Sequence, residues 1–389
     1  MERTIDNCFY QIQNGANIKQ GDKDGGFPIT RIETIANDKF NRDRMGYAGI
    51  TDLDKYRSYV LEDGDLLMSH INSVQYLGRT VLYEQEDNEI IIHGMNLLRL
   101  KAKRDIVNPA FARYCFYATP FRRQIANITK KSVNQASFAV ADLKRVKLNI
   151  PGIDEQSAVV DKLDKVRRII EIINEELRQL DYLIKARFVE MFGDPVDNPK
   201  DWEQVKLKDV SEGKLSYGSG ASAIDYDGEC RYIRITDITD AGDLTEEAKS
   251  PDSYDERYIL NDGDILFARS GATVGKTLCY NKQKHGKALY AGYLIRMVPN
   301  TDKVLPSYVF YYTKTDYYSS FIENAQRTVA QPNINAQEYG DLIICVPPIG
   351  LQEQFQQFVE QVDKSKVAIQ KSLDETQLLF DSLMQEYFG

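Results

Sequence analysis

The 389-residue sequence contains an internal duplication, in which short motifs recur in the same order 196 to 199 residues apart. Residues 60–67 (VLEDGDLL) match residues 259–266 (ILNDGDIL), and Gly-Arg-Thr at 78–80 matches Gly-Lys-Thr at 275–277. Most of the residues between these motifs differ. Self-similarity at a fixed separation is the sequence signature of a repeated structural unit. We therefore expect two copies of one unit that share a frame and carry different surface residues.

Each copy is expected to begin with a domain that mixes helices and strands. Residues 1–153 and 195–349 alternate short runs rich in Val, Ile and Tyr with turns rich in Gly, Asp and Asn. This alternation is typical of strands joined by tight turns. We also expect one helix over residues 109–126 and one over residues 306–325, because each segment starts at a proline, which is common in the first turn of a helix.

Each domain is followed by a segment predicted as one long helix, residues 154–194 and 350–389. Apolar residues recur there at alternating spacings of three and four, which is the pattern of a coiled-coil seam. The simplest way for each helix to bury its apolar stripe is to pair with the other copy. We therefore expect an α+β fold with two mixed α/β domains, each followed by a long helix. The two helices should pair as an antiparallel intramolecular coiled coil, related by a pseudo-twofold repeat. The predicted seam consists of Leu163, Val166, Ile170, Ile173, Leu177, Leu180, Ile184, Val359, Val362, Ile369, Leu373, Phe380 and Leu383.

The formal net charge of −9 at first argues against a nucleic-acid partner, since a basic domain is the usual footprint of one. The charge is unevenly distributed, however. The two helical segments together carry −7, whereas residues 66–153 carry +7 and residues 265–349 carry +4. A basic face that also holds polar and aromatic residues suits phosphate contact and the reading of base edges. The alternative interpretation is a solvated surface of mixed charge.

Three motifs that resemble catalytic or ligand-binding signatures are better explained by structure. The glycines of residues 271–277 are separated by three residues, whereas a phosphate-binding loop needs four. Residues 108–111 (NPAF) lack the second proline of the adenine-N6 methyltransferase signature. The Asp-Gly-Asp motifs at 63–65 and 262–264 are typical of tight turns. We predict no catalytic residues, no metal site and no cofactor.

The remaining features bear on the compartment. The five cysteines are scattered and form no C-x-x-C motif, so we expect neither a redox nor a zinc site. The sequence shows no basic segment followed by an apolar one at its start, and its longest apolar runs are far shorter than a membrane span. We expect a cytoplasmic protein without a membrane partner.

The repeated frame resembles the specificity subunit of type I restriction-modification enzymes. The resemblance is carried by the Asp-Gly-Asp-Ile/Leu-Leu turns, by Gln135 and Gln331, and by the sequence Met-Phe-Gly-Asp-Pro at 191–195. It is also carried by Glu-Gln dipeptides at 155–156 and 353–354, each shortly after a proline. Aligned on these dipeptides, the first boundary is two residues shorter than the second.

The resemblance implies that each α/β unit is a target-recognition domain that reads one half of a bipartite, asymmetric site in double-stranded DNA. It also implies that the helices act as a spacer and dock two modification (methyltransferase) subunits, which recruit restriction subunits. The specificity subunit itself is non-catalytic in that family. Our candidates for DNA contact are His70, Arg79, Lys130, Lys131, Gln135, Arg269, Lys276, Arg327, Gln331 and Asn333.

Two other functional classes stay open at this point. A coiled-coil scaffold or adaptor with protein-binding α/β domains would show no sequence-specific retention on DNA. A self-contained DNA-modifying enzyme would transfer methyl groups without other subunits. Neither explains why the frame residues repeat while the residues between them differ, which is what the reading of two different half-sites requires.

Overall fold

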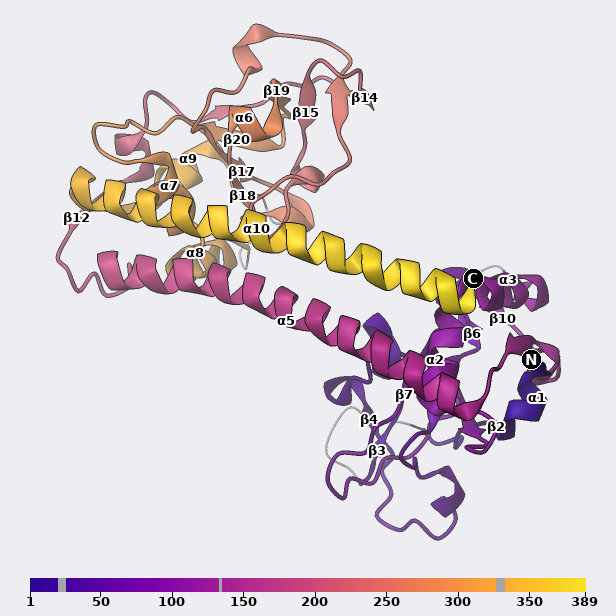
Figure 1. Ribbon diagram of the computed structural model, residues 1–389. Helices are drawn as coiled ribbons and strands as arrows, with labels where there is room; N and C mark the ends of the chain where they lie inside the picture. Colours follow the sequence, from indigo (N-terminus) through magenta and orange to yellow (C-terminus); the bar gives the residue numbers. More distant parts are fainter. Residues whose placement is uncertain (20–25, 133–134, 327–332) are drawn as a thin grey trace. The chain divides into compact units, whose positions relative to one another are not determined.

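The computed structural model describes residues 1–19, 26–132, 135–326 and 333–389 (Figure 1). The chain divides into two compact units. Unit 1 comprises residues 1–174 and 371–389, and unit 2 comprises residues 175–370. Each unit therefore combines one α/β domain with part of both long helices.

Unit 1 is built on a four-stranded antiparallel sheet with the strand order β2-β8-β5-β7. One of its two inner strands, β5, is called the central strand below. It is buried along its whole length, as expected from the apolar run after the Asp-Gly-Asp turn. A separate strand pair joins β1 to β11, so the beginning of the domain lies beside its end. The sheet elements are β1 (Glu2–Thr4), β2 (Phe9–Asn14), β3 (Pro28–Ile29), β4 (Gly46–Tyr47), β5 (Leu66–Ser69), β6 (Ile71–Asn72), β7 (Thr80–Leu82), β8 (Leu97–Ala102), β9 (Lys130–Lys131), β10 (Ala136–Ser137) and β11 (Lys147–Asn149).

Unit 2 repeats this topology, with a four-stranded antiparallel sheet in the order β13-β20-β17-β18. The pairing of Ile265 in β17 with Met297 in β20 corresponds to that of Leu66 in β5 with Leu100 in β8. The pair β12–β21 corresponds to β1–β11. The strands are β12 (Glu203–Lys206), β13 (Ser216–Tyr217), β14 (Ala223–Asp225), β15 (Arg231–Ile233), β16 (Lys249–Pro251), β17 (Ile265–Ala268), β18 (Thr277–Cys279), β19 (Ala288–Tyr290), β20 (Leu294–Met297) and β21 (Ile343–Val346).

Short helices cover the sheets, and here the prediction of a single helix over residues 109–126 and over residues 306–325 is wrong. In unit 1 the chain forms two helices because Pro120 lacks the N–H that a continuous helix would need. In unit 2 the hydroxyls of Thr313 and Thr315 donate to the carbonyls three residues earlier, at 2.7 Å each, and such bonds compete with helix continuation. The short helices are α1 (Ile5–Cys8), α2 (Pro109–Tyr117), α3 (Thr119–Ile128), α4 (Val140–Arg145), α6 (Lys282–His285), α7 (Pro306–Tyr312), α8 (Asp316–Gln326) and α9 (Ala336–Gly340).

The two long helices, α5 (Ile153–Phe192) and α10 (Ile349–Phe388), each contain 40 residues. In unit 1 the start of α5 lies beside the end of α10, where Lys162 Nζ donates to Tyr387 Oη at 3.1 Å. In unit 2 the end of α5 lies beside the start of α10, where Lys366 Nζ is 2.6 Å from Asp181 Oδ1. The helices are thus antiparallel within each unit, and the predicted fold class is confirmed. All thirteen seam residues are buried or half-buried.

The helices belong to the cores of the domains and are more than a connection between them. In unit 1 the ring of Phe388 packs against Phe111 of α2, with centroids 5.0 Å apart. In unit 2 the ring of Phe188 lies 5.5 Å from Tyr308 of α7 and 5.4 Å from Phe355 of α10. Each α/β domain therefore completes its core with side chains from both α5 and α10.

A buried glutamine ties each domain to the start of its following helix. The Oε1 atoms of Gln156 and Gln352 each accept a backbone N–H at 2.8 Å, and each Nε2 donates to two backbone carbonyls. The partners are Asn108, Ile106 and Pro151 for Gln156, and Leu305, Lys303 and Pro347 for Gln352. The equivalence of these glutamines, at an offset of 196, shows that our alignment of the Glu-Gln dipeptides was wrong. The two boundaries have the same length, because each glutamine follows its proline by five residues.

Among the residues that the structure describes, no helix is long and apolar enough to cross a bilayer. Within the same residues, no group of three or more His, Cys, Asp or Glu side chains is placed to hold a metal ion.

Candidate nucleic-acid interface

The Asp-Gly-Asp turns fix the central strand of each sheet. Asp264 Oδ2 accepts the N–H of Asn261 at 2.6 Å and lies 2.8 Å from Arg296 Nε. In unit 1 Asp65 and Arg99 form the corresponding buried pair, at 3.7 Å. The glycines between the aspartates have φ values of +86° and +85°, which a side chain would strain. The repeated motif is therefore part of the shared frame. It fixes the central strand and so positions the residue that follows it.

That residue is His70 in unit 1 and Arg269 in unit 2, and both are among the predicted DNA contacts. Each directly follows the buried central strand. The carbonyl of His70 accepts the N–H of Phe138 at 3.3 Å, and that of Arg269 accepts the N–H of Ile334 at 2.9 Å. The backbone frame is the same in both units, whereas the side chain at this position differs.

In unit 1 the position holds a neutral pair, the buried His70 and the exposed Asn14. His70 is 5% exposed, and its Nε2 lies 3.0 Å from Asn14 Nδ2, which also donates to the carbonyl of Met95. Burial lowers the pKa of His70 to about 4, so the ring is neutral at pH 7 and its Nε2 can accept from Asn14. His70 itself offers little surface to a ligand in this conformation.

The exposed candidates of unit 1 gather next to this pair. Lys130 and Lys131 form β9, which pairs with β10, and β10 pairs with β6 directly after His70. Both lysines are exposed, as is Gln135 directly before β10. The structure thus brings His70, Lys130, Lys131 and Gln135 to one small sheet.

In unit 2 the position holds a cation. The Arg269 guanidinium lies over the ring of Tyr217, 4.7 Å from its centroid, and Nε donates to Asn333 Oδ1 at 3.1 Å. The Tyr217 hydroxyl accepts the N–H of Ala336 at 3.0 Å, which anchors the far end of the ring. The structure therefore brings the candidates Arg269 and Asn333 into direct contact. Arg327 and Gln331 lie outside the described residues.

Arg79 and Lys276 occupy equivalent turns, and each is paired with an aspartate. Arg79 Nε lies 3.0 Å from Asp38 Oδ1, and its guanidinium lies over Tyr76. Lys276 Nζ lies 2.9 Å from Asp240 Oδ1. These cations are held in place, and a DNA phosphate would have to compete with a carboxylate for them.

Sequence reasoning missed Asn14 and Tyr217. Each is the last residue of the first strand of its sheet, and each contacts the residue after the central strand. They lie 203 residues apart, outside the offsets of the recognisable motifs, because the segments before the Asp-Gly-Asp turns differ between the copies. Only the pairing of these strands with β8 and β20 aligns them.

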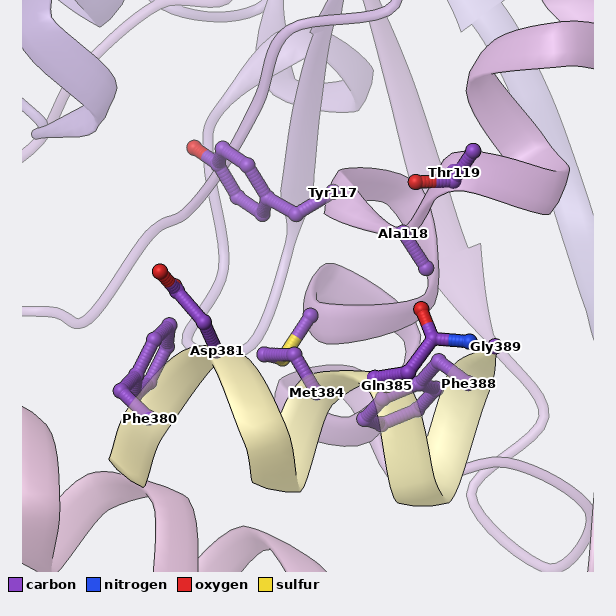
Figure 2. Close-up of a pocket in the computed structure, with 9 residues that line it drawn as sticks. All are labelled: Tyr117, Ala118, Thr119, Phe380, Asp381, Met384, Gln385, Phe388 and Gly389. Carbon is purple, nitrogen blue, oxygen red and sulfur yellow. The ribbon is translucent and has the colours of Figure 1, made fainter. Parts of the chain in front are cut away.

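A surface hollow of about 300 Å³ lies in unit 1 between the α2–α3 junction and the last turns of α10 (Figure 2). Unit 2 has different residues at the equivalent positions. Lys314 stands in place of Ala118, and its Nζ lies 4.7 Å from the ring centroid of Phe310. The buried Phe188 stands in place of Met384. Burial lowers the pKa of Lys314 to about 8. None of the DNA-contact candidates lines the hollow, whose residues are Tyr117, Ala118, Thr119, Phe380, Asp381, Met384, Gln385, Phe388 and Gly389.

Comparison with known proteins identifies the repeated unit. Residues 6–182 and 199–376 each match the family model described as the type I restriction modification DNA specificity domain. The chain belongs to this family. The predicted family and the predicted role as a specificity subunit, a DNA-recognition subunit that is not itself the enzyme, are thereby confirmed.

Curated relatives carry the same description. The chain is 26% identical over 375 residues to the putative type I restriction enzyme MjaX specificity subunit of Methanocaldococcus jannaschii, covering 93% of this chain and 86% of that protein. It is 22% identical over 395 aligned positions to the StySPI specificity subunit of Salmonella potsdam, covering 97% and 83%.

Two solved structures share the fold of this specificity subunit. The type I restriction-modification S subunit from M. genitalium aligns with a TM-score of 0.59 at 14% identity, over 100% of this chain and 96% of that one. A chain from a structural study of complex assembly and conformational transition of the type I restriction-modification system aligns with a TM-score of 0.56 at 17% identity, over 100% and 97%.

Proposed function

We propose that this specificity subunit reads a bipartite, asymmetric site in double-stranded DNA, one half-site with each α/β domain. Residues 1–153 and 195–349 are the target-recognition domains, and residues 154–194 and 350–389 are the spacer helices. The observation that carries the proposal is the position after the central strand. There the same backbone frame holds the buried His70 beside the exposed Asn14 in unit 1 and Arg269 over Tyr217 in unit 2. A shared scaffold with different polar groups is what the reading of two different sequences requires.

Seven of the ten candidates divide by their chemistry. Lys130 and Lys131 are exposed and make no ion pair with a carboxylate of the described residues. They suit phosphate contact, which positions a protein on DNA without reading the sequence. Arg79 and Lys276 serve the same purpose once a phosphate displaces their aspartates. Gln135, Asn333 and Arg269 carry the forked or planar groups that read base edges.

The partners in this proposal are two modification (methyltransferase) subunits, through which restriction subunits join in the cytoplasm. Support comes from the two long helices, which repeat one sequence pattern and carry most of the net negative charge. Several of their large apolar side chains face outward, which is typical of surfaces that bind protein. These residues are Ile153, Ile169, Ile172, Tyr182, Leu183 and Val189 on α5, and Val367, Leu378 and Leu379 on α10.

The test is a domain exchange in the assembled complex. The chain is expressed with the modification subunits of its system, and the methylated sites are mapped across the genome. Replacing residues 195–349 by the corresponding domain of another specificity subunit should change one half-site and leave the other unchanged. Methylation without a sequence preference would contradict the proposal and would favour the scaffold alternative. Inserting one heptad into both long helices should lengthen the permitted spacer between the half-sites.

A further inference from the structure

We propose that Arg269 reads a guanine in the major groove, so that the half-site bound by unit 2 contains a G·C pair at this point of contact. The inference rests on the proposed function and assigns a base to one of its residues. Guanine presents two acceptors side by side, O6 and N7, and a guanidinium that donates two parallel hydrogen bonds is their commonest protein partner.

The first step is the orientation of the guanidinium. Its face lies on the ring of Tyr217, and the ring is fixed in turn because its hydroxyl accepts the N–H of Ala336. The edge that carries Nε is occupied by Asn333 Oδ1 at 3.1 Å. Stacking and one hydrogen bond thus determine both the plane and the rotation of the group, and a guanidinium held in this way loses little freedom on binding.

The second step concerns the atoms that this arrangement leaves for a ligand. Within the described residues, Nη1 and Nη2 of Arg269 make no hydrogen bond and no ion pair. They lie on the side of the group away from its attachment to the chain. The surroundings are open, because Tyr217 is 42% exposed and Tyr293, whose carbonyl accepts the N–H of Arg269, is 63% exposed. A base edge can therefore approach the two terminal nitrogens without displacing a carboxylate, unlike a group that approaches Lys276.

The third step is the contrast with unit 1. His70 occupies the equivalent position, but it is buried and its Nε2 already faces Asn14. A single imidazole cannot present two parallel donors in one plane. The guanine contact is therefore specific to unit 2, and the two half-sites should differ at this point.

The experiment uses the full chain in complex with its modification subunits, with binding measured to duplexes in which each base pair of both half-sites is changed in turn. Wild type should show one G·C pair in the unit 2 half-site whose replacement weakens binding about 5- to 150-fold. Arg269→Lys keeps the charge and loses the fork, so this discrimination should fall to near unity at that one base pair. Preferences at every other position, and throughout the other half-site, should stay as in wild type.

Two further variants keep the test decisive. Asn333→Ala removes the acceptor of Arg269 Nε together with an amide that is itself a candidate for reading a base edge. If Arg269→Lys proves unstable, Asn333→Ala should reduce discrimination at the base pair assigned to Arg269, in addition to any change at a base that Asn333 itself contacts. Arg257→Lys makes the same chemical change at an exposed arginine of unit 2 that is paired with Asp255, and it should leave all preferences unchanged.

The outcomes separate the inference from the function on which it rests. A wild-type complex without any sequence preference would overturn the proposed function. A bipartite preference with no G·C pair in the unit 2 half-site would overturn the assignment of Arg269 alone. A uniform loss of binding to every duplex in Arg269→Lys would also overturn it, since that is the behaviour of a phosphate contact.

Discussion

Gln156 and Gln352 make the same three hydrogen bonds in their two units, each between a long helix and the domain before it. Both side chains are fully buried. We expect Gln352→Met, which keeps the size of the side chain, to lower the free energy of unfolding by about 2–4 kcal/mol, because it leaves one N–H and two carbonyls without partners. Thermal or denaturant unfolding measures this. Gln354→Met, at the exposed position of the dipeptide, should change stability by less than about 0.5 kcal/mol. Equal effects of the two variants would contradict the register at offset 196.

His70 and His93 should make the protein less stable in acid. Burial lowers the pKa of His70 to about 4 and that of His93 to about 3, whereas an unfolded histidine titrates near 6.5. As the pH falls from 6.5 to 4, the unfolded chain takes up a proton that folded His70 does not, so stability falls by about 3 kcal/mol for this residue. Calorimetry of wild type and His70→Gln between pH 4 and 7 should show a shallower loss in the variant. An identical pH dependence would contradict the burial of a neutral ring.

Lys276 should contribute to affinity without contributing to sequence preference. In the complex with modification subunits, Lys276→Ala should weaken binding to all duplexes and reduce the magnitude of the salt slope by about 0.9, the value for one phosphate contact. Lys364→Ala removes the same charge from an exposed position on α10 and should leave the salt slope nearly unchanged. A salt slope in Lys276→Ala equal to that of wild type would show that Asp240 keeps this ammonium away from DNA.

The hollow beside α10 should accept an aromatic ring. Met384→Phe introduces the residue that unit 2 has at the equivalent position 188, where the ring is buried against Tyr308 and Phe355. Because the ring fills space that is empty in unit 1, we expect the free energy of unfolding to rise by about 1 kcal/mol. Glu386→Phe adds the same ring at an exposed position of that helix and should give no gain. A loss of stability in Met384→Phe would mean that the hollow cannot widen to accept the ring.

The features that were predicted correctly from the sequence are those that depend on local patterns of residues. The long helices follow from apolar residues at spacings of three and four, and the central strands follow from the Asp-Gly-Asp turn and the apolar run after it. Three predictions were wrong. The helix over 109–126 is interrupted at Pro120, a local signal that the prediction did not use. The other two errors came from features that no local pattern reports. The helix over 306–325 is interrupted by threonine hydroxyls, and the Glu-Gln dipeptides look alike although only Gln156 and Gln352 are buried.

Of the residue pair that forms the candidate site in each unit, only one member was predictable from the sequence. His70 and Arg269 follow a recognisable motif, so an offset of 199 aligns them. Asn14 and Tyr217 come from segments without shared residues, and strand pairing alone brings them to the same place. The residues that distinguish the units are thus the ones that a search for similarity between them passes over.

The contact between Phe111 and Phe388 has a consequence for when the first α/β domain can fold during synthesis. The first α/β domain is synthesised early, but the aromatic side chains that close its core belong to the last turns of α10, and Phe388 follows Phe111 by 277 residues in the chain. Domains usually fold one after another as the chain emerges, but the first domain cannot complete its core until the last turns of α10 have been synthesised. Until residue 388 has been synthesised, part of the apolar core of the first domain stays exposed. We therefore expect nascent chains of unit 1 to depend on chaperones more than those of unit 2.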